Sequence, residues 1–169
     1  QKTGTDNAPG PVDYHQLGLY VLERAATHRG TAFVEIYQNC NIFNDGAFDV
    51  LSDKETKASH VLELEHGKPM LFGKQREKGI TVGRDLRPRV VEAASVGADE
   101  LLVHDETSEF VALLLSRFTH PEFPTPIGVF RAVARPSYDG LMTEQLEQAQ
   151  SVKHDSVQQL LDEGHRTVK

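Results

Sequence analysis

The sequence predicts an α/β fold in which a mixed or parallel sheet is flanked by helices, and two observations support that class. An amphipathic stretch, residues 12–28, is followed by a short β-branched and aromatic run, residues 31–37. A second apolar run, residues 100–103, is followed by a helical pattern over residues 108–118. Helices that alternate with buried strands are typical of α/β layers.

The N-terminal third is expected to hold one helix and one strand. Apolar side chains recur at close to helical spacing within residues 12–28, and Gly30 is a suitable helix stop. The run TAFVEIY at residues 31–37 is the strongest strand signal in the sequence, because it is short, β-branched and aromatic and has polar neighbours. Residues 1–11 contain Gly, Asn and Pro and are predicted to be a linker or a disordered edge.

The middle of the chain is expected to contain short elements. Residues 56–73 resemble a hairpin whose first strand is Val61–Leu64, and residues 74–88 are compatible with a loop or with two short strands. Residues 89–95 are predicted to begin a short helix. Residues 100–103 then predict a strand, and residues 108–118 a helix with Phe110, Val111, Leu114 and Leu115 on one face.

The C-terminal part is expected to change from strand to helix. Residues 127–134 are strand-like, and the apolar positions within residues 141–162 predict a surface helix or helix pair. The predicted organisation is therefore a linker at residues 1–11, an α/β domain portion at 12–140 and a C-terminal helical segment at 141–169.

Composition excludes several classes of function. The formal net charge is -7 and no two Lys or Arg residues are adjacent, so the clustered cations that nucleic-acid binding needs are absent. No apolar run approaches the roughly 20 residues of a membrane span, and the expected compartment is cytoplasmic. The single cysteine, Cys40, excludes an intrachain disulfide and a metal site built from cysteines of this chain alone.

Cys40 lies three residues after the predicted strand, in the polar loop QNCNIFNDGAFD at residues 38–49. Three interpretations are open: an inert, partly apolar thiol, a ligand of iron or an iron–sulfur cluster, and a nucleophile paired with a histidine. No local signature places a histidine beside Cys40, which disfavours the nucleophile. In the cluster interpretation, backbone N–H groups of the loop surround the sulfur. The residues expected around such a cluster are Asn41, Asn44, Asp45 and Gly46.

The stretch FVEIYQNCNIFNDGAF, residues 33–48, resembles a segment of the β subunits of 2-oxoacid:ferredoxin oxidoreductases. The shared pattern is Gln-x-Cys-x-x-Phe-Asn-Asp, which here comprises Gln38, Cys40, Phe43, Asn44 and Asp45. Blocks in the same order as in the C-terminal region of that family are LERAATHRG, HGKPMLFG, DELLVHD and IGVFRAVARPSYDG. The resemblance extends from about residue 12 to the end of the chain.

The resemblance implies the C-terminal part of a thiamine-diphosphate-binding-type α/β domain. Such enzymes decarboxylate a 2-oxoacid on thiamine diphosphate and Mg²⁺, transfer the acyl group to coenzyme A, and pass electrons through a [4Fe-4S] cluster to ferredoxin. By resemblance, Cys40 is the fourth cluster ligand, and the NDGAF run favours the 2-oxoglutarate type. An α subunit and the N-terminal half of the β subunit, or an equivalent chain, are the implied partners.

Two departures from the family pattern indicate that the chain is inactive alone. The family's other three cluster cysteines are absent, and so is the Gly-Asp-Gly motif of its Mg²⁺ and diphosphate site. Catalytic residues cannot therefore be assigned in this chain. A cofactor-free interaction or scaffold module with the same fold remains the alternative function, and the lone cysteine favours it.

Two weaker candidates are expected to be structural. His104, Asp105 and Glu106 could form a metal or acid/base cluster, but adjacent residues rarely converge on one metal ion. Arg131, Arg135 and Tyr138 could contact an anionic cofactor or a neighbouring subunit, although packing and surface pairing are the expected roles.

Overall fold

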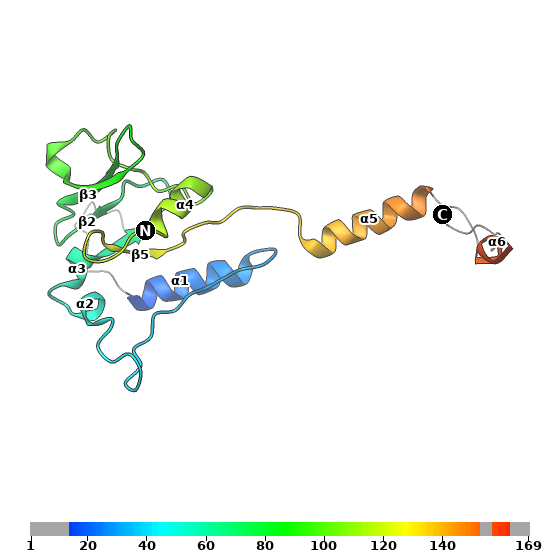
Figure 1. Cartoon of the computed structure of the whole chain (residues 1–169), viewed down its shortest axis with the longest axis horizontal. Coiled ribbons are helices and arrows are strands. Elements are labelled where there is room, and N and C mark those ends of the chain that lie inside the picture. Colours follow the sequence, from blue (N-terminus) through cyan, green and yellow to red (C-terminus); the bar gives the residue numbers. More distant parts are fainter. Residues whose placement is uncertain (1–13, 153–156, 163–169) are drawn as a thin grey trace, which may run out of the picture. The chain divides into compact units, whose positions relative to one another are not determined.

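A computed structural model describes residues 14–152 and 157–162 of the chain (Figure 1). The described residues form two compact units, of which the first holds residues 14–28 and 32–133 and the second holds residues 29–31 and those from 134 onward. The elements in chain order are α1 (Tyr14–Thr27), α2 (Asp49–Ser52), α3 (Lys57–His60), β1 (Val61–Leu64), β2 (Leu71–Phe72), β3 (Lys78–Val82), β4 (Pro88–Glu92), a 3₁₀ turn (Ala93–Ser95), α4 (Glu109–Leu115), β5 (Thr125–Gly128), α5 (Tyr138–Val152) and α6 (Val157–Asp162).

The strands of the first unit pair in both directions. β1 and β5 are parallel, with Leu62 opposite Pro126 and Leu64 opposite Gly128. β2, β3 and β4 form a three-stranded antiparallel sheet in which Ile80 lies opposite Val90. Parallel pairing within a helix-containing unit confirms the predicted α/β class, and it joins segments about sixty residues apart, as parallel strands require long crossovers.

The hydrophobic core lies where β1, the β2–β3 pair and α4 meet. Leu62 and Ile80 are completely buried, and Leu115 of α4 is almost so. Because side chains i and i+4 share one face of a helix, Val111 and Leu115 reach this core together. The core cluster comprises Leu62, Leu64, Met70, Phe72, Ile80, Val111, Leu115 and Phe118.

The predicted helix at residues 108–118 is confirmed as α4. Ser108 precedes it in an extended conformation, and its Oγ accepts a hydrogen bond from the backbone N–H of Val111 at 3.3 Å. This N-cap satisfies one donor that the first helical turn would otherwise leave unpaired. Phe110, which was expected on the buried face, is half exposed instead.

The prediction of a strand at residues 31–37 is wrong, because the structure has no strand there. No ladder includes these residues, and no backbone–backbone hydrogen bond within the described part of the chain involves residues 31–37. Phe33 is 89% exposed and Ile36 is 72% exposed. The residue types favour an extended backbone, but a strand exists only where a second strand pairs with it.

Four further expectations were wrong in detail. The hairpin at residues 56–73 does not form, because β1 pairs with β5 and β2 pairs with β3. Residues 88–92 form a strand rather than a helix, and only three residues of 3₁₀ turn follow. Residues 100–103 make two isolated bridges instead of a strand. β5 spans Thr125–Gly128, so only its last two residues overlap the strand predicted at 127–134.

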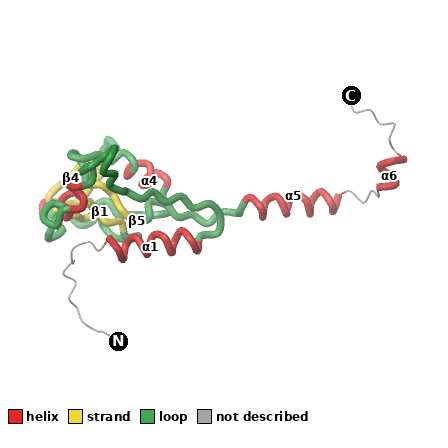
Figure 2. The backbone as a smooth tube through the Cα atoms, turned by 90° about the horizontal axis from the view of Figure 1, so that it is seen from below, coloured by secondary structure: helices red, strands yellow, loops and turns green. Residues whose placement is uncertain are grey.

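The C-terminal helical prediction is confirmed by α5 and α6, although α5 begins at Tyr138, before residue 141. The predicted linker at residues 1–11 lies outside the described residues. Among the helices of the described ranges, none has the length and apolar character needed to cross a bilayer. In the first unit, α1 lies along β5, as Figures 1 and 2 both show.

We expect the first unit to lose stability as the pH falls below neutrality because of His60. Burial lowers the pKa of His60 below its ordinary value of 6.5, and the nearby His120 and Lys78 lower it further. A base whose pKa is lower in the folded state binds protons more readily when unfolded, so its stabilising contribution is present above pH 6.5 and is lost as the pH falls through the folded pKa.

Urea unfolding between pH 7.5 and pH 5 measures this effect. His60→Gln is expected to show a shallower fall of the unfolding free energy than the parent protein over that range. Parallel pH profiles for the two proteins would show that His60 does not contribute.

Candidate cysteine loop and adjacent apolar groove

Cys40 opens a tight loop that directly follows the extended segment at residues 32–39. The backbone N–H of Asn44 donates to the carbonyl oxygen of Cys40 at 2.9 Å, and the two residues form an isolated antiparallel bridge. Cys40 is a free cysteine and is partly buried. The loop therefore holds the thiol at a defined place at the end of an otherwise unpaired segment.

Asn39 organises the loop from within. Its Nδ2 donates to Asn41 Oδ1 and to Asp45 Oδ1, both at 3.0 Å, while its Oδ1 accepts from the backbone N–H of Gly46 at 3.0 Å. Asn39 was not among the residues predicted around a cluster. The signal that could have identified it is an Asn followed by polar residues in a turn, since such side chains commonly bond to nearby backbone.

Gly46 is required by the backbone of this loop. Its φ is +75°, which side-chain-bearing residues adopt only at a cost. A Cβ atom there would also lie 3.1 Å from Asp49 Oδ2. The residues predicted around Cys40 are thus brought together, with Asn41, Asp45 and Gly46 all bonded to Asn39.

Backbone amides favour the ionised form of the Cys40 thiol. Hydrogen bonding from the backbone N–H of Phe43, and then from those of Ile42 and Asn44, lowers the pKa of Cys40 below its ordinary value, against a smaller opposing effect of burial. Thiolate is the form that binds metal ions and attacks electrophiles. A thiol whose ionised form is favoured in this way is suited to binding a metal ion as a thiolate.

The loop offers one metal ligand and no complete site. Within residues 14–152 and 157–162, no group of three or more His, Cys, Asp or Glu side chains converges on a point where a metal ion would fit. The Asp45 carboxylate is already engaged by Asn39. Ile42 and Phe43, which follow the cysteine in the loop, are each more than 80% exposed.

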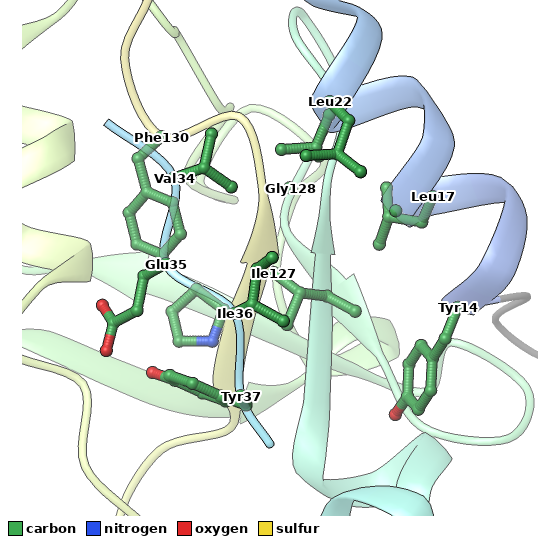
Figure 3. Close-up of a pocket in the computed structure, with 13 residues that line it drawn as sticks. Tyr14, Leu17, Leu22, Val34, Glu35, Ile36, Tyr37, Ile127, Gly128 and Phe130 are labelled. Atoms are coloured by element: carbon green, nitrogen blue, oxygen red, sulfur yellow. The ribbon is translucent and has the colours of Figure 1, made fainter. Parts of the chain in front are cut away.

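An apolar groove of about 340 Å³ lies in the same unit as the cysteine loop. We call it the α1–β5 groove. Its walls are one face of α1, the extended residues 34–37, and residues 126–130 in and after β5. In Figure 3, Leu17 and Leu22 point from α1 toward the strand that carries Ile127, whereas the carboxylate of Glu35 points away from α1.

His104, Asp105 and Glu106 have separate structural roles, as expected. His104 is 1% exposed, and its Nε2 lies 2.8 Å from the carbonyl oxygen of Val129. Asp105 accepts hydrogen bonds from Thr107, which lower the pKa of its carboxyl, and Glu106 pairs with Arg24 at 2.9 Å. The three side chains therefore do not converge on one metal ion.

Of the two arginines singled out in the sequence, Arg131 makes a surface ion pair. Arg131 lies 3.2 Å from Glu109 in an exposed ion pair, which contributes little stability. Tyr138 is 79% exposed at the start of α5. Arg131 belongs to the first unit, whereas Arg135 and Tyr138 belong to the second.

Comparison with known proteins gives one informative similarity. The chain is 40% identical over 144 residues to the 2-oxoglutarate oxidoreductase subunit KorB of Mycobacterium tuberculosis, a match that covers 83% of this chain and 38% of that protein. No family model matches the chain, and no solved structure matches it. A match of this length necessarily includes Cys40. It confirms the resemblance that the motifs predicted: over most of its length, the chain is similar to a segment of the KorB subunit.

Proposed function

We propose that this chain is the portion of a 2-oxoglutarate:ferredoxin oxidoreductase β subunit that supplies Cys40 as one ligand of a [4Fe-4S] cluster. The observation that carries the proposal is the geometry of the loop, in which the Asn44 N–H to Cys40 C=O hydrogen bond and the side-chain bonds of Asn39 hold a free thiol at the start of a tight turn. The similarity to KorB, whose name specifies 2-oxoglutarate oxidoreductase, supports the assignment of substrate.

The chemistry of the Cys40 thiolate suits a ligand of one iron atom of a cluster. Thiolate sulfur is the soft ligand that iron–sulfur clusters take, and hydrogen bonds to that sulfur tune the reduction potential. The hydrogen bonds of Asn39 to Asn41, Asp45 and Gly46 connect the residues on either side of positions 42–44 and so hold the loop in one conformation. In this proposal Asn41, Asn44, Asp45 and Gly46 form the wall around that part of the cluster.

The rest of the enzyme must supply what this chain lacks. The sequence contains one cysteine, so three cluster ligands come from the remainder of the β subunit or an equivalent chain. The same remainder, with an α subunit, would hold thiamine diphosphate, Mg²⁺ and the 2-oxoacid and would receive coenzyme A. When bound, the cluster would carry the electrons released by oxidative decarboxylation toward ferredoxin. The described residues of this chain hold and orient one thiolate.

An anaerobic visible spectrum, with iron and sulfide quantitation, tests the proposal on material purified with its partners attached. The parent complex is expected to show the broad absorption of thiolate-ligated iron, and Cys40→Ala to lose most of the iron and the band. Ser52→Ala removes one small polar side chain of α2 whose Oγ bonds only to local carbonyls, and it should retain the spectrum.

The second candidate is a cofactor-free interaction module with the same fold. The observation that favours it is the lone cysteine beside an extensive apolar surface. Colourless, iron-free complexes in the parent protein, with no difference between it and Cys40→Ala, would reject cluster ligation and favour this module.

A further inference from the structure

The extended residues 32–39 lack backbone partners. Apart from the bridge at Cys40, no hydrogen bond between backbone groups involves them within the described part of the chain. Their N–H and C=O groups are strong donors and acceptors, and folded proteins pair nearly all such groups once they are buried. These groups can therefore accept a partner backbone without displacing any bond that the structure shows.

Several side chains of the same segment are large, apolar and exposed. Ile36 lines the α1–β5 groove, yet 72% of its surface is exposed, and Phe33, three residues earlier in the segment, is 89% exposed. Ile42 and Phe43 of the cysteine loop are also largely exposed. Several exposed large apolar side chains on one short stretch of chain, next to an apolar groove, mark a site of protein contact.

The length of the related protein indicates what covers the surface. The match to KorB accounts for 38% of that subunit, so most of a KorB-like chain lies outside the segment described here. Cys40 stands at the end of the unpaired residues, and the proposed function requires three further ligands to approach it. A polypeptide that brings those ligands to Cys40 approaches the C-terminal end of this segment.

We propose that residues 33–37 and the α1–β5 groove bind the remainder of the β subunit, which presents a backbone to residues 33–37 and apolar side chains to the groove. This rests on the proposed function for the identity of the occupant. The physical basis is independent of the cluster, because the pairing of backbone groups and the burial of Ile36 and Phe33 require no cofactor.

Site-specific photo-crosslinking in the producing cells tests the occupant. A benzophenone-bearing phenylalanine derivative replaces Ile36 in one protein and Leu113 of α4 in another, the latter being 57% exposed and outside the groove. The Ile36 probe is expected to crosslink to a polypeptide whose peptides match the part of KorB outside the 144-residue match, at least tenfold more than the Leu113 probe. Crosslinks from Ile36 to a second copy of this chain, to an unrelated protein, or to nothing would overturn the proposal.

A charge substitution gives a second, quantitative measurement. Ile36→Asp is expected to reduce co-purification of the same polypeptide at least tenfold, because a carboxylate would be buried without a partner. Leu113→Asp should have no such effect. Since Ile36 is largely exposed, the isolated Ile36→Asp chain should melt close to the parent. Equal co-purification in the two variants would reject the docking surface.

Failure of this inference can be distinguished from failure of the proposed function. Cys40→Ala should leave the Ile36 crosslink unchanged, because the docking contacts do not include the thiol. Crosslinking to the β-subunit remainder in iron-free complexes supports docking and rejects cluster ligation. An iron-containing complex without that crosslink supports ligation and rejects the docking surface.

Discussion

Replacing Leu115 with Ala is expected to lower the free energy of unfolding of the first unit by about 2 to 5 kcal/mol. Leu115 is 1% exposed and belongs to the core where α4 meets β1 and the β2–β3 pair. Truncation removes buried apolar surface and leaves a cavity, since neighbouring side chains relax only partly into the space. Urea unfolding followed by far-ultraviolet circular dichroism measures the change.

Leu113→Ala is the matched control, because it makes the same chemical change on the same helix. Leu113 is 57% exposed and does not belong to the core cluster. Its replacement should change the unfolding free energy by about 0.5 kcal/mol or less. Similar losses for the two variants would mean that the face of α4 that packs on the core has been assigned incorrectly.

Replacing Gly128 with Ala is expected to destabilise the β1–β5 pair by about 1 to 3 kcal/mol. Gly128 ends β5 with a φ of +123°, a conformation that side-chain-bearing residues rarely adopt. A Cβ atom there would also lie 3.0 Å from the carbonyl oxygen of Leu64, on the paired strand. Strain and backbone crowding therefore act together at this position, and urea unfolding reports their sum.

Gly67→Ala separates these two contributions. Gly67 also has a positive φ, +74°, but a Cβ atom there would meet nothing within 4 Å. Its replacement should cost about 1 kcal/mol, from backbone strain alone. A loss at Gly67 equal to or greater than that at Gly128 would show that crowding against Leu64 adds nothing.

Helices and turns whose sequence signals lie within the element itself were predicted correctly. α1 and α4 were expected within two or three residues of their observed ends, because the spacing of apolar residues and the position of Ser108 act within the helix itself. The cysteine loop was also identified, since its Asn, Asp and Gly residues favour turns. The three hydrogen bonds of Asn39 were not predicted. Several polar side chains of the loop could have made them, and the choice depends on the folded conformation.

Elements that need a distant partner were mispredicted. Residues 31–37 have the composition of a strand but are unpaired in the described structure. Residues 88–92 form β4 because β3 is adjacent, with Val91 opposite Gly79. Sequence reports the preference of a backbone for the extended conformation, whereas the hydrogen bonds that make it a strand come from elsewhere in the chain.

The sequence by itself determined the α/β class, the one available thiolate, the polar loop around it and the resemblance that the match to KorB confirms. These properties depend on residue identity and on local spacing. Only the tertiary structure decided that β1 pairs with β5 and that an apolar groove lies along α1. Each of these depends on the approach of segments or atoms whose positions are set by packing of the whole unit, which no local pattern encodes.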